Sequence, residues 1–161
     1  MTDTTSLAGR LAGTWFGSGL AAQDRQRLVA GASLRPFVIG EELLREGAAC
    51  DTLGVVLTGL LGVQVQVPGR GPTTLLTIEP GDVYGWSALV PPYRSTSTVL
   101  GVAPGEVITF AADELRALLR EDDPLAATLY PRLLQSMGRR LTATRLQLLD
   151  LYAREREVVP W

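Results

Sequence analysis

The spacing of apolar and polar residues divides the chain into a β-rich middle and helical ends. Across residues 34–110, short apolar or β-branched runs alternate with glycine and proline. Within residues 60–67, LLGVQVQV, three valines share one face and two glutamines the other. VPGRGP and EPGD are typical of turns between strands. Seven or eight short strands at this spacing predict a sandwich, roll or barrel.

The two ends of the chain show helical periodicity. Residues 21–30 predict a short amphipathic helix before the strands, and a further helix follows the last strand. Asp123 as a cap, followed by Pro124, predicts the start of a last helix that runs to about residue 154. Pro131 lies inside that helix and predicts a kink or a break there.

A heptad pattern of apolar residues follows Pro131. One series is Leu134, Leu141 and Leu148, and the other is Met137, Thr144 and Leu151. This pattern predicts a parallel homodimer, because a helix of about 23 residues, at ~1.5 Å each, is too long for one small roll to cover. The alternative is that the stripe packs on its own domain. Thr144 interrupts the stripe, and either sets the register or touches something held beside it.

Composition predicts one folded domain in the cytoplasm. The chain has 161 residues, of which 46% are hydrophobic and 20% charged, as expected for an ordered soluble protein. We divide it into an N-terminal helical segment (1–33), a β-rich part (34–112) and C-terminal helices (113–161). The net charge of −2 gives no electrostatic footprint for nucleic acid. No window is apolar enough to span a membrane, and the single cysteine, Cys50, suits a reducing compartment.

The absence of histidine narrows the possible chemistry most. The chain has no histidine, and all of its basic residues are arginine. Imidazole metal sites and Ser-His or Cys-His catalytic pairs are therefore excluded, and little remains for acid–base catalysis near pH 7. We therefore expect no catalytic residues, no metal site and no cofactor, and we do not expect an enzyme.

The order of these parts resembles the cyclic nucleotide-binding domain of bacterial catabolite activator proteins and of the regulatory subunits of cAMP-dependent kinases. The resemblance covers about residues 34–150. It is carried by Gly47 in LLREGAACDTL, by VVLTGLLGV, PGDVYG, Arg94-Ser95 and SMGRRLTATRLQLL. It implies a mainly β fold with flanking helices: a β-roll (a double-stranded β-helix of jelly-roll type) with an N-terminal helix and a long C-terminal dimerisation helix.

The resemblance also implies a phosphate-binding cassette within residues 81–99, GDVYGWSALVPPYRSTSTV, for cAMP or a related cyclic nucleotide. A cyclic phosphodiester is a monoanion, and Arg94 offers it a planar fork of donors. A short helix expected at Ser87–Val90 adds backbone N–H groups. The predicted phosphate-binding residues are Gly85, Ser87, Ala88, Arg94 and Ser95.

The ribose and base region departs from the family pattern. We place it at Leu76, Trp86, Thr144 and Arg145. Trp86 stands where the family has a glutamate that accepts the ribose 2′-hydroxyl, and indole has only a donor. Thr144 matches a threonine that meets the purine, whereas Arg145 replaces a serine and either stacks on the base or blocks the pocket. The phosphate half of the site therefore matches the family and the other half does not.

Two functions are consistent with this pattern. The first is a stand-alone cAMP-like sensor that acts as a homodimer and signals through contacts with another protein. The alternative is a ligand-independent dimeric scaffold with a degenerate pocket. A metal-dependent cupin, which has a similar roll, would need histidine ligands. No helix-turn-helix follows the last helix, so we expect no direct DNA binding.

Overall fold

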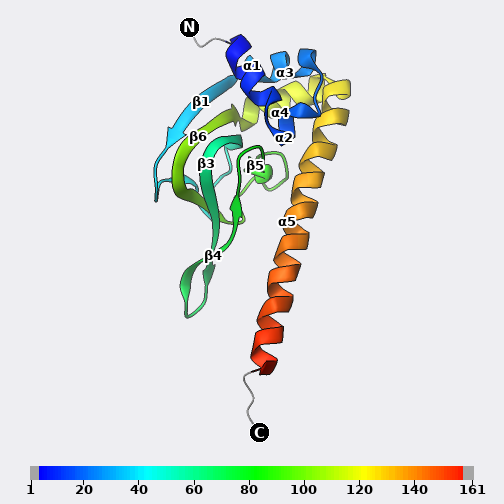
Figure 1. The fold of residues 1–161 in the computed structure, drawn as a ribbon. Coiled ribbons are helices and arrows are strands. Elements are labelled where there is room, and N and C mark those ends of the chain that lie inside the picture. Colours follow the sequence, from blue (N-terminus) through cyan, green and yellow to red (C-terminus); the bar gives the residue numbers. More distant parts are fainter. Residues whose placement is uncertain (1–3, 158–161) are drawn as a thin grey trace.

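The computed structural model describes residues 4–157 (Figure 1). The helices are α1 (Thr4–Ala12), α2 (Trp15–Ser18), α3 (Ala22–Val29), α4 (Ala112–Glu121) and α5 (Asp123–Glu157), with a 3-10 turn η1 (Trp86–Ala88). The strands are β1 (Ala32–Phe37), β2 (Glu42–Leu44), β3 (Thr52–Val67), β4 (Gly71–Ile78), β5 (Val83–Tyr84) and β6 (Thr98–Ala111). The ends of the predicted domain, residues 1–3 and 158–161, lie outside the described residues.

The strands form one antiparallel sheet that curls into a roll. Its main order is β1-β6-β3-β4, with β2 added to β6 and β5 to β3. The predicted β-roll with flanking helices and a long C-terminal helix is confirmed (Figure 1).

The strands are fewer and longer than predicted, because turn residues inside them bend the chain without ending it. β3 has 16 residues and β6 has 14. Gly59, in the middle of β3, has φ 80°, and a Cβ on it would lie 2.5 Å from the carbonyl oxygen of Pro104. The pairing of β3 with β6 shifts register there. Such bulges sharpen the bend of a strand, so one long strand contributes to both sides of the roll.

The helix α5 is continuous from Asp123 to Glu157, so Pro131 does not break it. Pro131 is exposed, which leaves the helix free to keep its buried face against the roll. That face includes Leu125, Leu129 and Leu133, four residues apart and all buried. Each such side chain contributes about 1.5–3 kcal/mol on burial.

The predicted cap of α5 is off by one residue. Asp122 is the cap: its buried carboxylate accepts a hydrogen bond from the Leu125 N–H at 3.1 Å and forms an ion pair with Arg27. Asp123 is exposed instead. The pair links α3 to the start of α5 and so fixes where the long helix leaves the roll.

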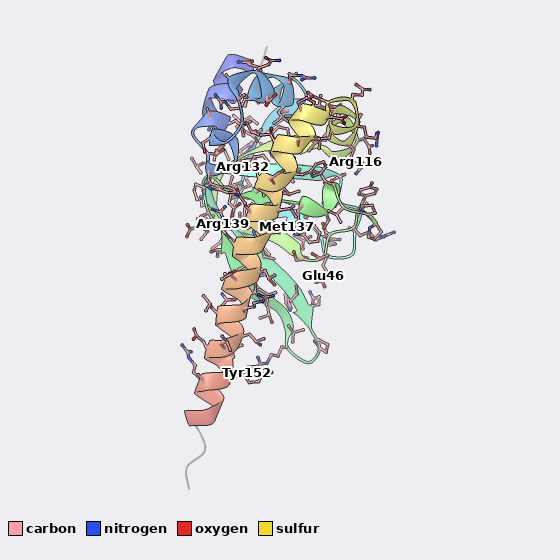
Figure 2. The ribbon with its side chains drawn as sticks, turned by 90° about the vertical axis from the view of Figure 1, so that its right-hand side faces the viewer. Glu46, Arg116, Arg132, Met137, Arg139 and Tyr152 are labelled. Atoms are coloured by element: carbon pink, nitrogen blue, oxygen red, sulfur yellow. The ribbon has the colours of Figure 1, made fainter. Side chains whose placement is uncertain are left out.

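Beyond the roll, α5 continues alongside the β3–β4 hairpin toward the lower end of the molecule (Figure 1). Figure 2 shows Met137 and Arg139 near the middle of the helix and Tyr152 near its C-terminal end. The middle of α5 therefore lies against the roll, and its last turns extend past the core.

Candidate functional site

A cavity of about 210 Å³ lies between the roll and α5. Its walls combine a large apolar surface with a smaller polar one. The apolar wall is Leu44, Val63, Val65, Leu75, Leu76, Ile78, Tyr84, Trp86 and Val99; the remainder is Gly85, Ser87, Ser95, Thr96, Ser97 and Arg140. Two of the valines come from the face that the alternating pattern of residues 60–67 indicates. No carboxylate is among these lining residues.

The start of the predicted cassette is a tight turn at Gly85. Its φ of 79° is one that glycine adopts without strain, and a Cβ here would lie under 3.0 Å from the carbonyl oxygen of Thr52. The short helix expected at Ser87–Val90 is the 3-10 turn at Trp86–Ala88. Ala88 is buried, donates its N–H to the Gly85 carbonyl at 2.9 Å, and does not line the cavity.

Arg94 lies outside the cavity. Its side chain is exposed, and Nη1 donates to the Gly47 carbonyl at 2.8 Å. The backbone here is extended and pairs with Ala49, so neighbouring side chains point to opposite sides. Ser95 consequently points inward, is buried and lines the cavity. Because side chains alternate along an extended segment, Arg94 and Ser95 point to opposite sides although they are adjacent in the predicted motif.

The cation that lines the cavity is Arg140, which reaches in from α5. Its Nη2 is buried and makes no hydrogen bond, and the same is true of Ser95 Oγ. Burial lowers the pKa of the Arg140 guanidinium, while attraction by Asp82 raises it; a guanidinium nevertheless stays charged. The Tyr84 hydroxyl, from a third lining residue, is also buried without a partner. Three such groups on the residues of one cavity require an explanation such as an anion or ordered water.

The residues predicted for the ribose and base divide into two sets. Trp86 and Leu76 line the cavity, and Trp86 is half-buried against the core. Thr144 and Arg145 do not line it. The Thr144 hydroxyl donates to the Arg140 carbonyl within α5 at 2.9 Å, and Arg145 is exposed.

The residues predicted for a dimer seam also divide. Leu134, Leu141, Leu148 and Leu151 are exposed, whereas Met137 packs against the core and Thr144 is half-buried. At 100° per residue, one exposed row of α5 keeps the predicted series Leu134, Leu141 and Leu148 and adds Tyr130 and Tyr152 to it. We call it the outer row: Tyr130, Leu134, Leu141, Leu148 and Tyr152, all exposed.

Sequence reasoning missed Arg140, although helical spacing indicates it. Leu133, Ser136 and Met137 face the roll, and Arg140 follows at the next three- or four-residue step. The pair Arg139-Arg140 was noticed only as part of a family likeness. Thr96 and Ser97, which follow the motif, were missed because nothing distinguishes them from loop hydroxyls.

The family model for the cyclic nucleotide-binding domain matches residues 34–122. That span is more than half of the chain and contains the whole predicted cassette. The chain belongs to the cyclic nucleotide-binding domain family. A search of curated protein sequences finds no match to it.

Solved structures resemble this cyclic nucleotide-binding domain in fold at low sequence identity. A cyclic nucleotide-binding domain from Methylobacillus flagellatus is 19% identical with a TM-score of 0.77, over 91% of this chain and 83% of that one. The regulatory domain of Toxoplasma gondii PKA with cAMP is 21% identical with a TM-score of 0.61, over 71% of this chain and 43% of that one.

A third structure is the regulatory subunit of a cAMP-independent protein kinase A from Trypanosoma cruzi bound to guanosine. It is 19% identical with a TM-score of 0.66, over 76% of this chain and 42% of that one. Among the described residues of our domain, no cluster of ligating side chains suits a metal. None of its helices within residues 4–157 is both long and apolar enough to cross a bilayer.

Proposed function

We propose that this domain is a sensor that binds a cyclic nucleotide, cAMP or a relative, in the cavity between the roll and α5. The observation that carries the proposal is that two hydrogen-bond donors, Ser95 Oγ and Arg140 Nη2, are buried without partners in residues that line that one cavity, as is the Tyr84 hydroxyl. A phosphodiester monoanion accepts from both and has two free oxygens to do so. Membership of the family and the cAMP in the Toxoplasma kinase structure support this ligand class.

The cavity is small for a nucleotide, so a part of its wall must move before a nucleotide can bind. About 210 Å³ is smaller than the ~300–1,000 Å³ typical of ligand pockets. Trp86 occupies part of the wall next to Gly85 and Ser87, and its indole is only half-buried. We expect this indole to swing out when a nucleotide enters and to cover the base or ribose afterwards.

The output of the proposed sensor is a homodimer formed along the outer row of α5. The row presents apolar side chains at intervals of four and seven residues on a helix that extends past the core. Arg140 lies on the same helix, so an anion that binds it acts directly on the dimerising element. A partner protein would read that change; no catalysis is involved, and residues 1–161 act as one domain.

Isothermal titration of cAMP and cGMP into wild type, Arg140→Gln and Arg94→Ala tests the binding proposal. Loss of one charged hydrogen bond costs about 1.5–3 kcal/mol, which is roughly a tenfold to hundredfold weaker Kd. We expect that loss for Arg140→Gln and little change for Arg94→Ala, which serves as a matched arginine control outside the cavity. The reverse ranking contradicts the assignment of the anion to Arg140.

The second candidate is the ligand-independent dimeric scaffold. The exposed position of Arg94 and the presence of Trp86 in the cavity wall favour it. The two functions predict different results in the same titration. A scaffold gives no heat, and its melting temperature does not shift at millimolar cAMP or cGMP.

A further inference from the structure

Arg140 faces a carboxylate on the side away from the cavity. Asp82, in the turn between β4 and β5, lies with Oδ2 at 3.8 Å from Arg140 Nη2. That distance allows charge attraction but no hydrogen bond, and the guanidinium nitrogen remains without a partner. The contact therefore holds Arg140 weakly.

The same carboxylate fastens one turn of α5 to the roll. Asp82 Oδ1 accepts from the fully buried Ser136 hydroxyl at 2.6 Å and from the Val83 N–H at 2.8 Å. Arg139 Nη2 lies 3.6 Å from Asp82 Oδ1. The Arg139 guanidinium also stacks over Trp15, with its Cζ 3.6 Å from the centre of the ring. Asp82 is thus held in place by strong hydrogen bonds, whereas Arg140 is not.

Arg140 also separates two cavities. The second, of about 320 Å³, contains Asp82, Glu79 and Trp15 in its walls. Arg140 and Leu76 are the residues common to the linings of both. The guanidinium consequently lies between a fixed carboxylate on one side and the cavity of the proposed site on the other.

We propose that Asp82 is the counter-ion that competes with the ligand's anion for Arg140, and so sets the affinity of the proposed site. A second negative charge brought to Arg140 is repelled by Asp82 across a partly buried region, where such repulsion is strong. An anion that accepts a hydrogen bond from Arg140 Nη2 gives this nitrogen the partner that Asp82, at 3.8 Å, does not provide. Binding therefore shifts Arg140 away from the helix turn that Asp82 fastens. The inference rests on the proposed function.

The test compares Asp82→Asn with wild type for cAMP, which is charged, and for adenosine, which is neutral. Asparagine keeps the acceptor for Ser136 and Val83 but removes the charge. We expect cAMP to bind Asp82→Asn about fivefold or more tightly, with the Kd of adenosine unchanged. If the role of Asp82 is purely structural, the Kd values of cAMP and adenosine should change by the same factor. Glu79→Gln is the matched control, because it removes a charge from the same turn without a contact to Arg140.

The outcomes distinguish a failure of the proposed competition between Asp82 and the ligand from a failure of the proposed cAMP binding. Unchanged or weaker cAMP binding to Asp82→Asn, or an equal gain for adenosine or for Glu79→Gln, overturns the competition. A gain that disappears in the Asp82→Asn, Arg140→Gln double variant supports it. If cAMP gives no heat with either protein, the proposed function fails, and inorganic phosphate becomes the probe. Equal affinity of the two proteins for phosphate, or no binding to Asp82→Asn, then overturns the competition.

Discussion

Replacement of Gly54 by alanine should strain the packing of Tyr84, a residue of the cavity wall. Gly54 in β3 pairs with Tyr84 in β5, and the Tyr84 side chain, 1% exposed, lies across the glycine. A Cβ on Gly54 would lie 2.5 Å from the Tyr84 hydroxyl oxygen and closer still to two ring carbons. The ring is rigid and enclosed, so the strand or the ring must shift.

The expected cost follows from two opposing effects. Overpacking of a filled core costs about 1–3 kcal/mol. Removing glycine from the unfolded chain returns about 0.4–1 kcal/mol. We therefore expect Gly54→Ala to lower the free energy of unfolding by up to about 2.6 kcal/mol.

Urea denaturation followed by circular dichroism measures this change as a lower midpoint at an unchanged m-value. Gly9→Ala is the control, because a Cβ placed there in α1 meets no heavy atom within 4 Å apart from its chain neighbours and the helix's own backbone; we expect equal or higher stability for it. Tyr84→Leu in the Gly54→Ala background should recover part of the loss, since leucine is narrower than the ring. Equal midpoints for Gly54→Ala and Gly9→Ala would refute the reasoning.

Three further predictions concern the proposed dimer, the cap of α5 and alkaline pH. If the proposed dimer forms along the outer row, Leu141→Glu should be a monomer in sedimentation equilibrium, whereas wild type and Leu146→Glu, exposed but off the outer row, should be dimers. The same mass for Leu141→Glu and wild type rules out the row. Asp122→Ala should lower the free energy of unfolding by about 1–3 kcal/mol through loss of the cap and of the ion pair with the half-exposed Arg27, and Asp123→Ala by clearly less; equal losses in urea would contradict the cap assignment. Burial raises the pKa of Tyr84 above its ordinary value of 10.0, so the folded state keeps a proton that the unfolded state loses, and stability should fall as pH rises above 10. Tyr84→Phe should remove that fall in urea titrations between about pH 9 and 11, and a fall of the same size in the variant would show that another group causes it.

The fold was predictable because its signals are local and repeated. Alternation in residues 60–67 identified a strand, and the Asp123-Pro124 start together with the heptad after Pro131 identified a helix. The number of strands was wrong because a glycine such as Gly59 looks like a turn in sequence, and only the pairing of β3 with β6 shows that the strand continues through it.

The site was predictable only in part, because the direction of a side chain depends on neighbouring segments. Gly85, Ser87 and Ser95, which we predict to bind phosphate, line the cavity. Arg94 does not, since pairing with Ala49 decides which of two adjacent residues points inward. Helical spacing places Arg140 on the face of α5 that packs on the roll, but the sequence does not show that this face reaches a cavity there. The assignment of Met137 to the dimer has a similar cause. The apolar stripe of a helix does not show whether a residue packs on its own domain or on a second subunit.

A crystal structure of the domain with cAMP tests the central claim most directly. We expect the phosphate oxygens within hydrogen-bond distance of Arg140 Nη2 and Ser95 Oγ, with Arg94 still bound to the Gly47 carbonyl. A phosphate held by Arg94, with Arg140 turned away from the ligand, would contradict the account.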